Sequence, residues 1–122
     1  MIAAALQVAA AFNLVCGGTM RTGPLGLALP ESGGAPFAIT YRIDLDRQLW
    51  CSDACDTTEP VASVLDGRII LREHYNPLGS SVITFDPASG RFADTRIDGE
   101  TATLRSGVCE AARFTGFPVR VA

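Results

Sequence analysis

Only one side chain in the sequence titrates near neutral pH without help from its surroundings. His74 is the sole histidine, and an imidazole with an ordinary pKa is the first candidate for general acid or base catalysis at pH 7. Glu73 and Asp44 are the carboxylates that could assist it in a hydrolase or lyase. No Gly-x-Ser-x-Gly motif accompanies the histidine, so nothing marks a nucleophile. A surface histidine on an exposed strand is the alternative interpretation.

Four cysteines could either hold a zinc ion or form two disulfides. Cys51 and Cys55 are separated by three residues, and no second close pair provides the other half of a zinc site. As disulfides, this pair would close a short loop, whereas Cys16 and Cys109 would join opposite ends of the chain. Disulfides persist outside the reducing cytosol. We expect two disulfides and no metal, in a periplasmic or secreted protein.

Arginine supplies all the positive charge, because the ten basic residues include no lysine. This composition excludes a P-loop lysine and a Schiff-base nucleophile. The net charge of −3 gives no electrostatic reason to expect nucleic acid as a partner. The strand pattern places Arg42, Arg72 and Arg105 on outward faces. We expect no cofactor.

The candidate binding residues are Trp50, Ile70, His74 and Tyr75. Trp50 either packs over the short disulfide or is an exposed anchor for a partner, a role in which tryptophan is frequent. Ile70 points outward beside His74 in the strand pattern. An exposed apolar patch containing such residues would indicate a binding module.

Alternating apolar and polar residues predict strands along most of the chain. In 37–45, for example, every second residue is apolar. No stretch between the turns has the apolar spacing of a helix longer than two turns. Strands are expected at 10–19, 37–45, 48–51, 61–65, 68–75, 80–86, 91–97 and 100–106.

Short turn sequences connect the later strands into a meander. Asp66-Gly67 and Asp98-Gly99 are typical of two-residue hairpins, and 86–90 supplies a proline and a glycine for a longer turn. A disulfide between the first strand and the end of the last would close the ribbon. The fold is therefore expected to be all-β, an antiparallel meander of about eight short strands in a closed small barrel or strongly curled sheet. A two-sheet sandwich is the alternative.

The strand at 68–75 breaks its own alternation. Ile69, Leu71 and Tyr75 would face the core, which places Glu73 in the same row and turns Arg72 outward. A β-bulge or an early exit from the sheet would repair this pattern, and a wet barrel mouth around Glu73 is the alternative.

The remaining organisation is that of one domain. The apolar segment 1–11 is either a signal peptide ending in a small-residue cleavage pattern or the start of the first strand. Residues 12–122 form a single β domain of ordinary size, with a long proline- and glycine-rich loop at 21–36. Polar and glycine residues interrupt every apolar run before it reaches the length of a membrane span.

Several motifs together resemble a group of small, exported and functionally uncharacterised alphaproteobacterial proteins. These motifs are FNLVCGGT at 12–19, YRIDL at 41–45, Trp50-Cys51 with Cys55, and Cys109 followed by FTGFP at 114–118. The resemblance implies export and paired cysteines, and it transfers no catalytic residue. In outline the chain is also similar to the small periplasmic lysozyme inhibitors, although no inhibitory motif is found.

The leading functional hypothesis is a non-enzymatic cell-envelope domain that binds a protein or a small ligand. A hydrolase or lyase using His74 with Glu73 or Asp44 is the first alternative. A carrier holding a small apolar molecule inside the barrel is the second, although eight strands leave room for one small ligand at most.

Overall fold

The computed structural model describes residues 10–26, 34–53, 55 and 57–118. The described residues form nine strands and no helix. The strands are β1 (Ala11–Pro24), β2 (Ala35–Asp44), β3 (Leu49–Ser52), β4 (Glu59–Pro60), β5 (Ser63–Leu65), β6 (Arg68–Asn76), β7 (Gly79–Asp86), β8 (Arg91–Asp98) and β9 (Thr101–Arg113). The expected signal peptide at 1–11 lies almost wholly outside these residues.

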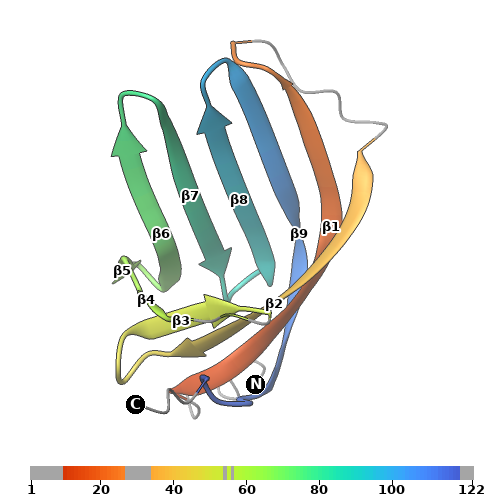
Figure 1. Cartoon of the computed structure of the whole chain (residues 1–122). Helices are drawn as coiled ribbons and strands as arrows, with labels where there is room; N and C mark the ends of the chain where they lie inside the picture. The colour runs from red at the N-terminus through yellow and green to blue at the C-terminus, as the bar shows by residue number, and fades with distance from the viewer. Residues whose placement is uncertain (1–9, 27–33, 54, 56, 119–122) are drawn as a thin grey trace.

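All nine strands belong to one antiparallel sheet in the order β4-β3-β2-β1-β9-β8-β7-β6-β5. The sheet is strongly curled into a half-barrel (Figure 1). The all-β meander is thus confirmed as a strongly curled sheet, and neither a fully closed barrel nor a two-sheet sandwich forms. The expected loop at 21–36 is shorter than predicted, because β1 continues to Pro24 and β2 begins at Ala35.

The first strand does pair with the last, but the opening of the sheet lies elsewhere. β1 and β9 pair over thirteen residues, from Phe12 opposite Arg113 to Pro24 opposite Thr101. The two edges of the sheet are β4 and β5, which follow each other in the chain. Here the Ala62 N–H donates to the Leu71 carbonyl over 3.3 Å. The half-barrel therefore has one end where its edges meet, which we call the Trp50 end, and another at the turns 76–79 and 98–101, which we call the turn end.

Both disulfides form as expected, Cys16 with Cys109 and Cys51 with Cys55. Cys16 and Cys109 are direct partners across β1 and β9, with their Cα atoms 4.0 Å apart. Cys109 thus lies within the last strand, which is longer than predicted, and not after it. The bridge joins the two halves of the meander at the centre of the sheet.

Two glycines allow β1 and β9 to approach closely beside this disulfide. Gly18 and Gly107 are direct partners. A Cβ at Gly18 would lie 1.9 Å from the Ser106 carbonyl oxygen, and one at Gly107 would lie 2.0 Å from the Gly17 carbonyl oxygen. No larger residue fits either position without moving backbone, so the sharp curl depends on this pair.

The turn chemistry works as predicted for two hairpins. Asp66 and Gly67 both have positive φ, 52° and 79°, which is the conformation of a type I′ turn. Gly90 also has positive φ, and its N–H donates to the Asp86 carbonyl over 2.8 Å. The third turn is displaced by one residue, since Asp98 pairs with Thr101 and leaves Gly99 and Glu100 as the turn.

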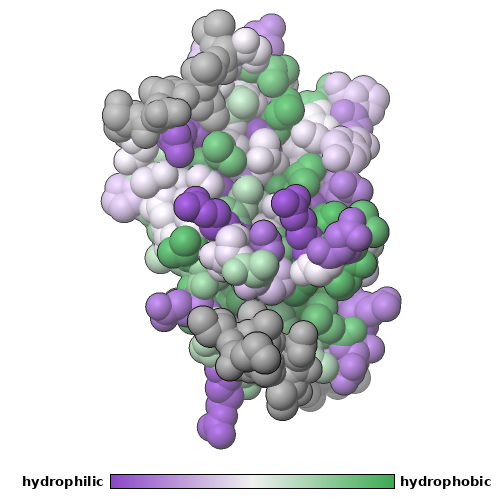
Figure 2. All heavy atoms as spheres, turned by 180° about the vertical axis from the view of Figure 1, so that it is seen from behind, coloured by the Kyte–Doolittle hydropathy of each residue, from purple (hydrophilic) through white to green (hydrophobic). Residues whose placement is uncertain are grey.

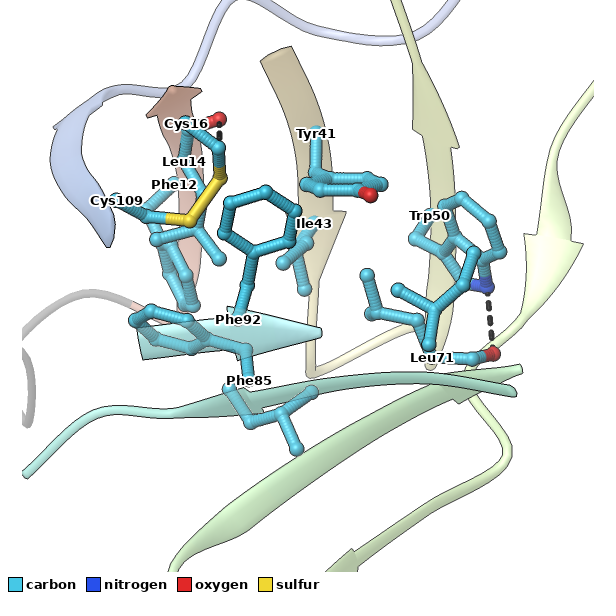
Figure 3. Packing of buried hydrophobic residues seen from close by; sticks show 12 residues of the cluster. Phe12, Leu14, Cys16, Tyr41, Ile43, Trp50, Leu71, Phe85, Phe92 and Cys109 are labelled. Carbon is cyan, nitrogen blue, oxygen red and sulfur yellow. Dashed lines mark hydrogen bonds between the residues drawn. A yellow bond between two sulfur atoms is a disulfide. The ribbon is translucent and has the colours of Figure 1, made fainter. Parts of the chain in front are cut away.

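The hydrophobic core lies on the concave face of the curl, towards the Trp50 end. Tyr41 makes edge-on ring contacts with Trp50 and with Phe92, so side chains from opposite walls meet there (Figure 3). The buried members of this cluster are Phe12, Leu14, Cys16, Tyr41, Ile43, Trp50, Ile69, Leu71, Ile83, Phe85, Phe92 and Cys109.

The outer face carries the C-terminal tail at the Trp50 end. Asn13 donates to the Thr115 hydroxyl over 2.9 Å, and Arg42 donates to the Gly116 carbonyl over 3.1 Å. Both side chains alternate with core residues along their strands, so the tail covers the outside of the sheet. Seen from behind Figure 1, hydrophobic residues are interspersed with hydrophilic ones over the surface (Figure 2).

Candidate ligand-binding site on the concave face

The concave face changes from apolar to polar along the length of the strands. Residues that pair across successive strands form rows on this face, and the last row of the core towards the turn end is entirely apolar. That row is Ile69, Phe85, Phe92, Gly107, Gly18 and Phe37. The following two rows, towards the turn end, are Arg72, Ile83, Asp94, Arg105 and Met20, then His74, Ser81, Arg96, Thr103 and Thr22.

A β-bulge in β6 brings Arg72 and His74 into these polar rows. The pairing with β7 shifts between Ile70 and Arg72, which confirms the predicted bulge. Leu71 occupies the bulge and is 1% exposed. Arg72 then pairs with Ile83, a buried residue of the concave face. The expected outward orientation of Arg72 and His74 is therefore wrong, because one extra residue exchanges the faces of everything after it.

Arg105 also faces the concave side, contrary to the prediction. Alternation from Cys109, which points inward to its disulfide partner, places Arg105 on the same face of β9. Leu104 takes the outer face and is half-buried. Only Arg42 of the three predicted outward arginines lies on the outer face.

Asp94 is the centre of the polar cluster. Its side chain is 1% exposed, and two arginines approach one oxygen each: Arg96 Nε lies 3.4 Å from Oδ1, and Arg105 Nη1 lies 3.7 Å from Oδ2. The Arg105 guanidinium also lies over the ring of Phe37, 5.5 Å from its centre. A buried carboxylate thus orients two cationic groups that remain partly exposed, 45% for Arg96 and 28% for Arg105.

Arg72 forms a second ion pair beside Asp94. Its Nε donates to Glu59 Oε2 over 3.0 Å, its Nη2 contacts Glu59 Oε1, and its Nη1 donates to the Ser81 hydroxyl. The guanidinium also lies over the Trp50 ring. The hydrogen bond to Glu59 raises the pKa of Arg72, against the opposing effect of burial. Arg72 is therefore fixed, and its charge is fully balanced.

Three buried polar atoms of the cluster, Tyr41 Oη, Asp94 Oδ2 and Arg105 Nε, have no hydrogen-bond partner among the described residues. Burial raises the pKa of Tyr41 above its ordinary value and the Asp94 charge raises it further, so the phenol stays protonated. Buried polar groups usually find partners. The cluster therefore holds two donors, Tyr41 O–H and Arg105 Nε–H, with unused hydrogen-bonding capacity.

The cluster has an excess of positive charge. Its three guanidiniums, on Arg72, Arg96 and Arg105, face two carboxylates, on Glu59 and Asp94. The low dielectric of a half-buried site strengthens the attraction of such groups for an anion. What the arrangement can do chemically is bind a negatively charged group at the polar rows.

The three residues proposed for catalysis do not come together. Glu73 and His74 are neighbours in β6 and point to opposite faces. Asp44 lies at the end of β2, where it accepts from Arg47 Nε over 2.8 Å, and this hydrogen bond lowers the pKa of Asp44. Within the described residues, His74 has no hydrogen bond or ion pair to either carboxylate.

The four candidate binding residues differ in burial and in the face of the sheet that they occupy, and they do not form one site. Trp50 is 2% exposed and donates through Nε1 to the Leu71 carbonyl over 2.8 Å, so it is a core residue and not an exposed anchor. Ile70 is half-buried on the outer face. His74 is exposed in the polar rows, whereas Tyr75 is 70% exposed beside the turn end.

Asp94, Arg96 and Tyr41 are the functional candidates that sequence reasoning missed. Alternation from Phe92 places Asp94 and Arg96 on the core side of β8, and an acidic residue in an inward row is a signal that could have been noticed. The predicted disulfide would have fixed the orientation of Arg105 in the same way. Tyr41 carried no signal, because its buried phenol looks like any other core aromatic residue.

Metal and membrane features are not found in the described part of the chain. No group of three His, Cys, Asp or Glu side chains there could hold a metal ion. No helix there has the length and apolar character needed to cross a bilayer.

The fold and the cluster together define a disulfide-braced, curled β domain with a basic site on its concave face. No family model, curated protein or solved structure matches the chain.

Proposed function

We propose that this protein is a non-enzymatic binding domain of the periplasm or the secreted fraction, and that it binds a small carboxylate-bearing ligand on its concave face. The observation that carries this proposal is the pair of partly exposed arginines, Arg96 and Arg105, that contact the buried Asp94. Two disulfides support an oxidising compartment, since such bonds are rare in the cytosol.

The charges favour an anionic group over a cationic or neutral one. A guanidinium presents a planar fork of donors that matches the two oxygens of a carboxylate. The side chains of Arg96 and Arg105 are partly exposed, and Asp94 contacts both guanidiniums. Fixing the donors in advance reduces the entropy cost of binding.

The other functional hypotheses have less support. An enzyme built on His74 would need a carboxylate partner on the same face, and Glu73 points away from it. An apolar-ligand carrier would need space at the Trp50 end, where Tyr41, Trp50 and Phe92 pack against one another. Of the expected partners, a protein or a small ligand in the cell envelope, we therefore propose a small anion.

Calorimetric titration with matched pairs of compounds tests this proposal. Small mono- and dicarboxylates are compared with their neutral amides, using the oxidised protein. We expect binding of carboxylates only, weakened by Arg96→Gln about tenfold or more, as for the loss of a charge-assisted hydrogen bond. Arg113→Gln, at an exposed arginine whose side chain has no hydrogen bond or ion pair to the described residues, is the matched control and should leave binding unchanged.

Two results would contradict the proposal. One is equal binding of amides and carboxylates, which would remove the role of charge. The other is carboxylate binding that Arg96→Gln and Arg113→Gln weaken equally, which would indicate a general effect of net charge and not a site.

A further inference from the structure

A groove of about 380 Å³ lies on the outer face of the sheet, across β6 to β9. None of the residues around Asp94 lines it, and most of its lining residues alternate with core residues along their strands, although Phe85, Phe92 and Gly107 of the concave face also line it. The lining residues on the outer face are Arg68, Thr84, Asp86, Arg91, Ala93 and Ser106.

The groove exists because a row of small residues lies beside a row of charged ones. Thr84 pairs with Ala93, and Ala93 pairs with Ser106, so three short side chains form a low strip across three strands. Asp86 pairs with Arg91 in the neighbouring row. The strip is thus the floor of the groove, and the charged row is one wall.

Arg68 and Arg91, the two arginines that line the groove, have no salt bridge within the described residues. Within the described residues, neither the Arg68 nor the Arg91 guanidinium makes a hydrogen bond, an ion pair or a ring contact, and both residues are exposed. Asp86 is the acid beside them, but its oxygens accept from the Ala88 N–H over 3.0 Å and the Ser89 hydroxyl over 3.2 Å. The Asp86 carboxylate therefore accepts hydrogen bonds within its own turn, and the Arg68 and Arg91 guanidiniums are available to a ligand.

We propose that this groove binds a phosphate monoester carried by an organic group. The backbones of β6 and β8 are two strand spacings apart, roughly 10 Å, so two flexible arginines from them can converge on one tetrahedral anion. The Thr84 and Ser106 hydroxyls on the floor are additional donors. A bare phosphate would fill little of the groove, whose volume falls in the range of roughly 300 to 1,000 Å³ that is usual for small-molecule sites.

Titration of the oxidised protein with glycerol 3-phosphate, glycerol and inorganic phosphate, followed by calorimetry and ³¹P NMR, tests the site. We expect the ester to bind more tightly than inorganic phosphate, and glycerol not to bind. Arg68→Gln and Arg91→Gln should each weaken the ester about tenfold, as for the loss of a charge-assisted contact. Arg96→Gln, on the concave face, and Arg113→Gln should leave its affinity unchanged.

The possible outcomes separate this site from the carboxylate site. Equal binding of inorganic phosphate and the ester would overturn the proposal, because it would indicate an adventitious ion only. Ester binding that Arg68→Gln and Arg91→Gln do not change, or that Arg96→Gln abolishes, would also overturn it. Vesicles containing phosphatidic acid form a further arm. Binding to these vesicles that depends on Arg68 and Arg91 would support the same chemistry and identify its source as a lipid headgroup.

Discussion

The two faces of the same strands use arginine in opposite ways. β6 carries Arg68 on its outer face and Arg72 on its concave face, and β8 carries Arg91 and Arg96 in the same arrangement. The concave arginines contact a buried or half-buried carboxylate, whereas the outer ones have no ion pair within the described residues. Residue type and strand are the same in each case, so the presence of a carboxylate within reach on the same face decides the role: Asp94 on β8 itself for Arg96, and Glu59 on β4 for Arg72.

This difference has an energetic basis. A buried charge must be paired, because the loss of its hydration is costly, and so Asp94 and its arginines depend on one another. An exposed arginine keeps its hydration and needs no partner, and it can lend its charge to a ligand with little effect on the fold. The concave arginines should therefore be sensitive to substitution, and the outer ones should tolerate it.

The largest effect is expected from the disulfide that fixes which face each residue of β9 occupies. Replacing Cys16 and Cys109 together by alanine should reduce the free energy of unfolding by about 4 to 5 kcal/mol, because their separation of 93 residues makes the closed loop long. The matched control, Cys51 and Cys55, closes a loop of only 4 residues and should cost about 2 kcal/mol. Urea unfolding of both double variants measures the difference. Equal losses would show that the central bridge has no special role.

Removing the acid at the centre of the concave cluster should have the next largest effect. Asp94→Ala leaves Arg96 and Arg105, which are both partly exposed, without their shared carboxylate and should destabilise the protein by about 1 to 3 kcal/mol. Asp98→Ala, at an exposed position of the same strand, should change stability by less than about 0.5 kcal/mol. Thermal and urea unfolding compare the two variants. A small loss for Asp94→Ala would contradict the distinction between the two faces.

Local chemistry made much of the fold predictable. The Asp66-Gly67 turn and the turn at 86–90 follow from residues close in sequence, and both disulfides follow from the number and spacing of the cysteines. The strand order could not be predicted from the sequence. The two edge strands, β4 and β5, lie where Trp50 of β3 donates a hydrogen bond to Leu71 of β6, and no local pattern encodes such a long-range contact.

The candidate site was harder to predict, because a shift of one residue reverses every face. The pattern in 68–75 predicts a bulge or an early exit from the sheet, but not the position of the bulge, and its place at Leu71 reverses the faces of Arg72 and His74. The strand pattern predicts an outward Arg105, whereas the cross-strand disulfide at Cys109 places it on the concave face. The register between distant strands, and not the pattern within one strand, brings the cluster around Asp94 together.

An exposed but paired arginine provides an intermediate case. Arg47 holds the pKa of Asp44 below its ordinary value, chiefly through a hydrogen bond. A carboxyl with a lowered pKa in the folded state stabilises the protein above its unfolded pKa, and this contribution is lost as pH falls through the lowered value. Arg47→Gln should therefore cost about 0.5 kcal/mol at pH 7, since Arg47 is largely exposed, and less in acid. Urea unfolding at pH 7 and pH 3 measures this, and an equal loss at both values would contradict it.

The smallest effect on stability is expected for the arginines of the outer face. Arg68→Gln and Arg91→Gln should each change the free energy of unfolding by less than about 0.5 kcal/mol, because neither guanidinium has a hydrogen bond or ion pair to lose among the described residues. Urea unfolding at low and moderate salt measures this, with Arg72→Gln as the concave counterpart. That variant leaves Glu59 without its partner and should cost clearly more. A loss for Arg91→Gln as large as that for Arg72→Gln would mean that the outer arginine has a structural partner, and the groove would then lose the unpaired charge on which its affinity for an anion depends.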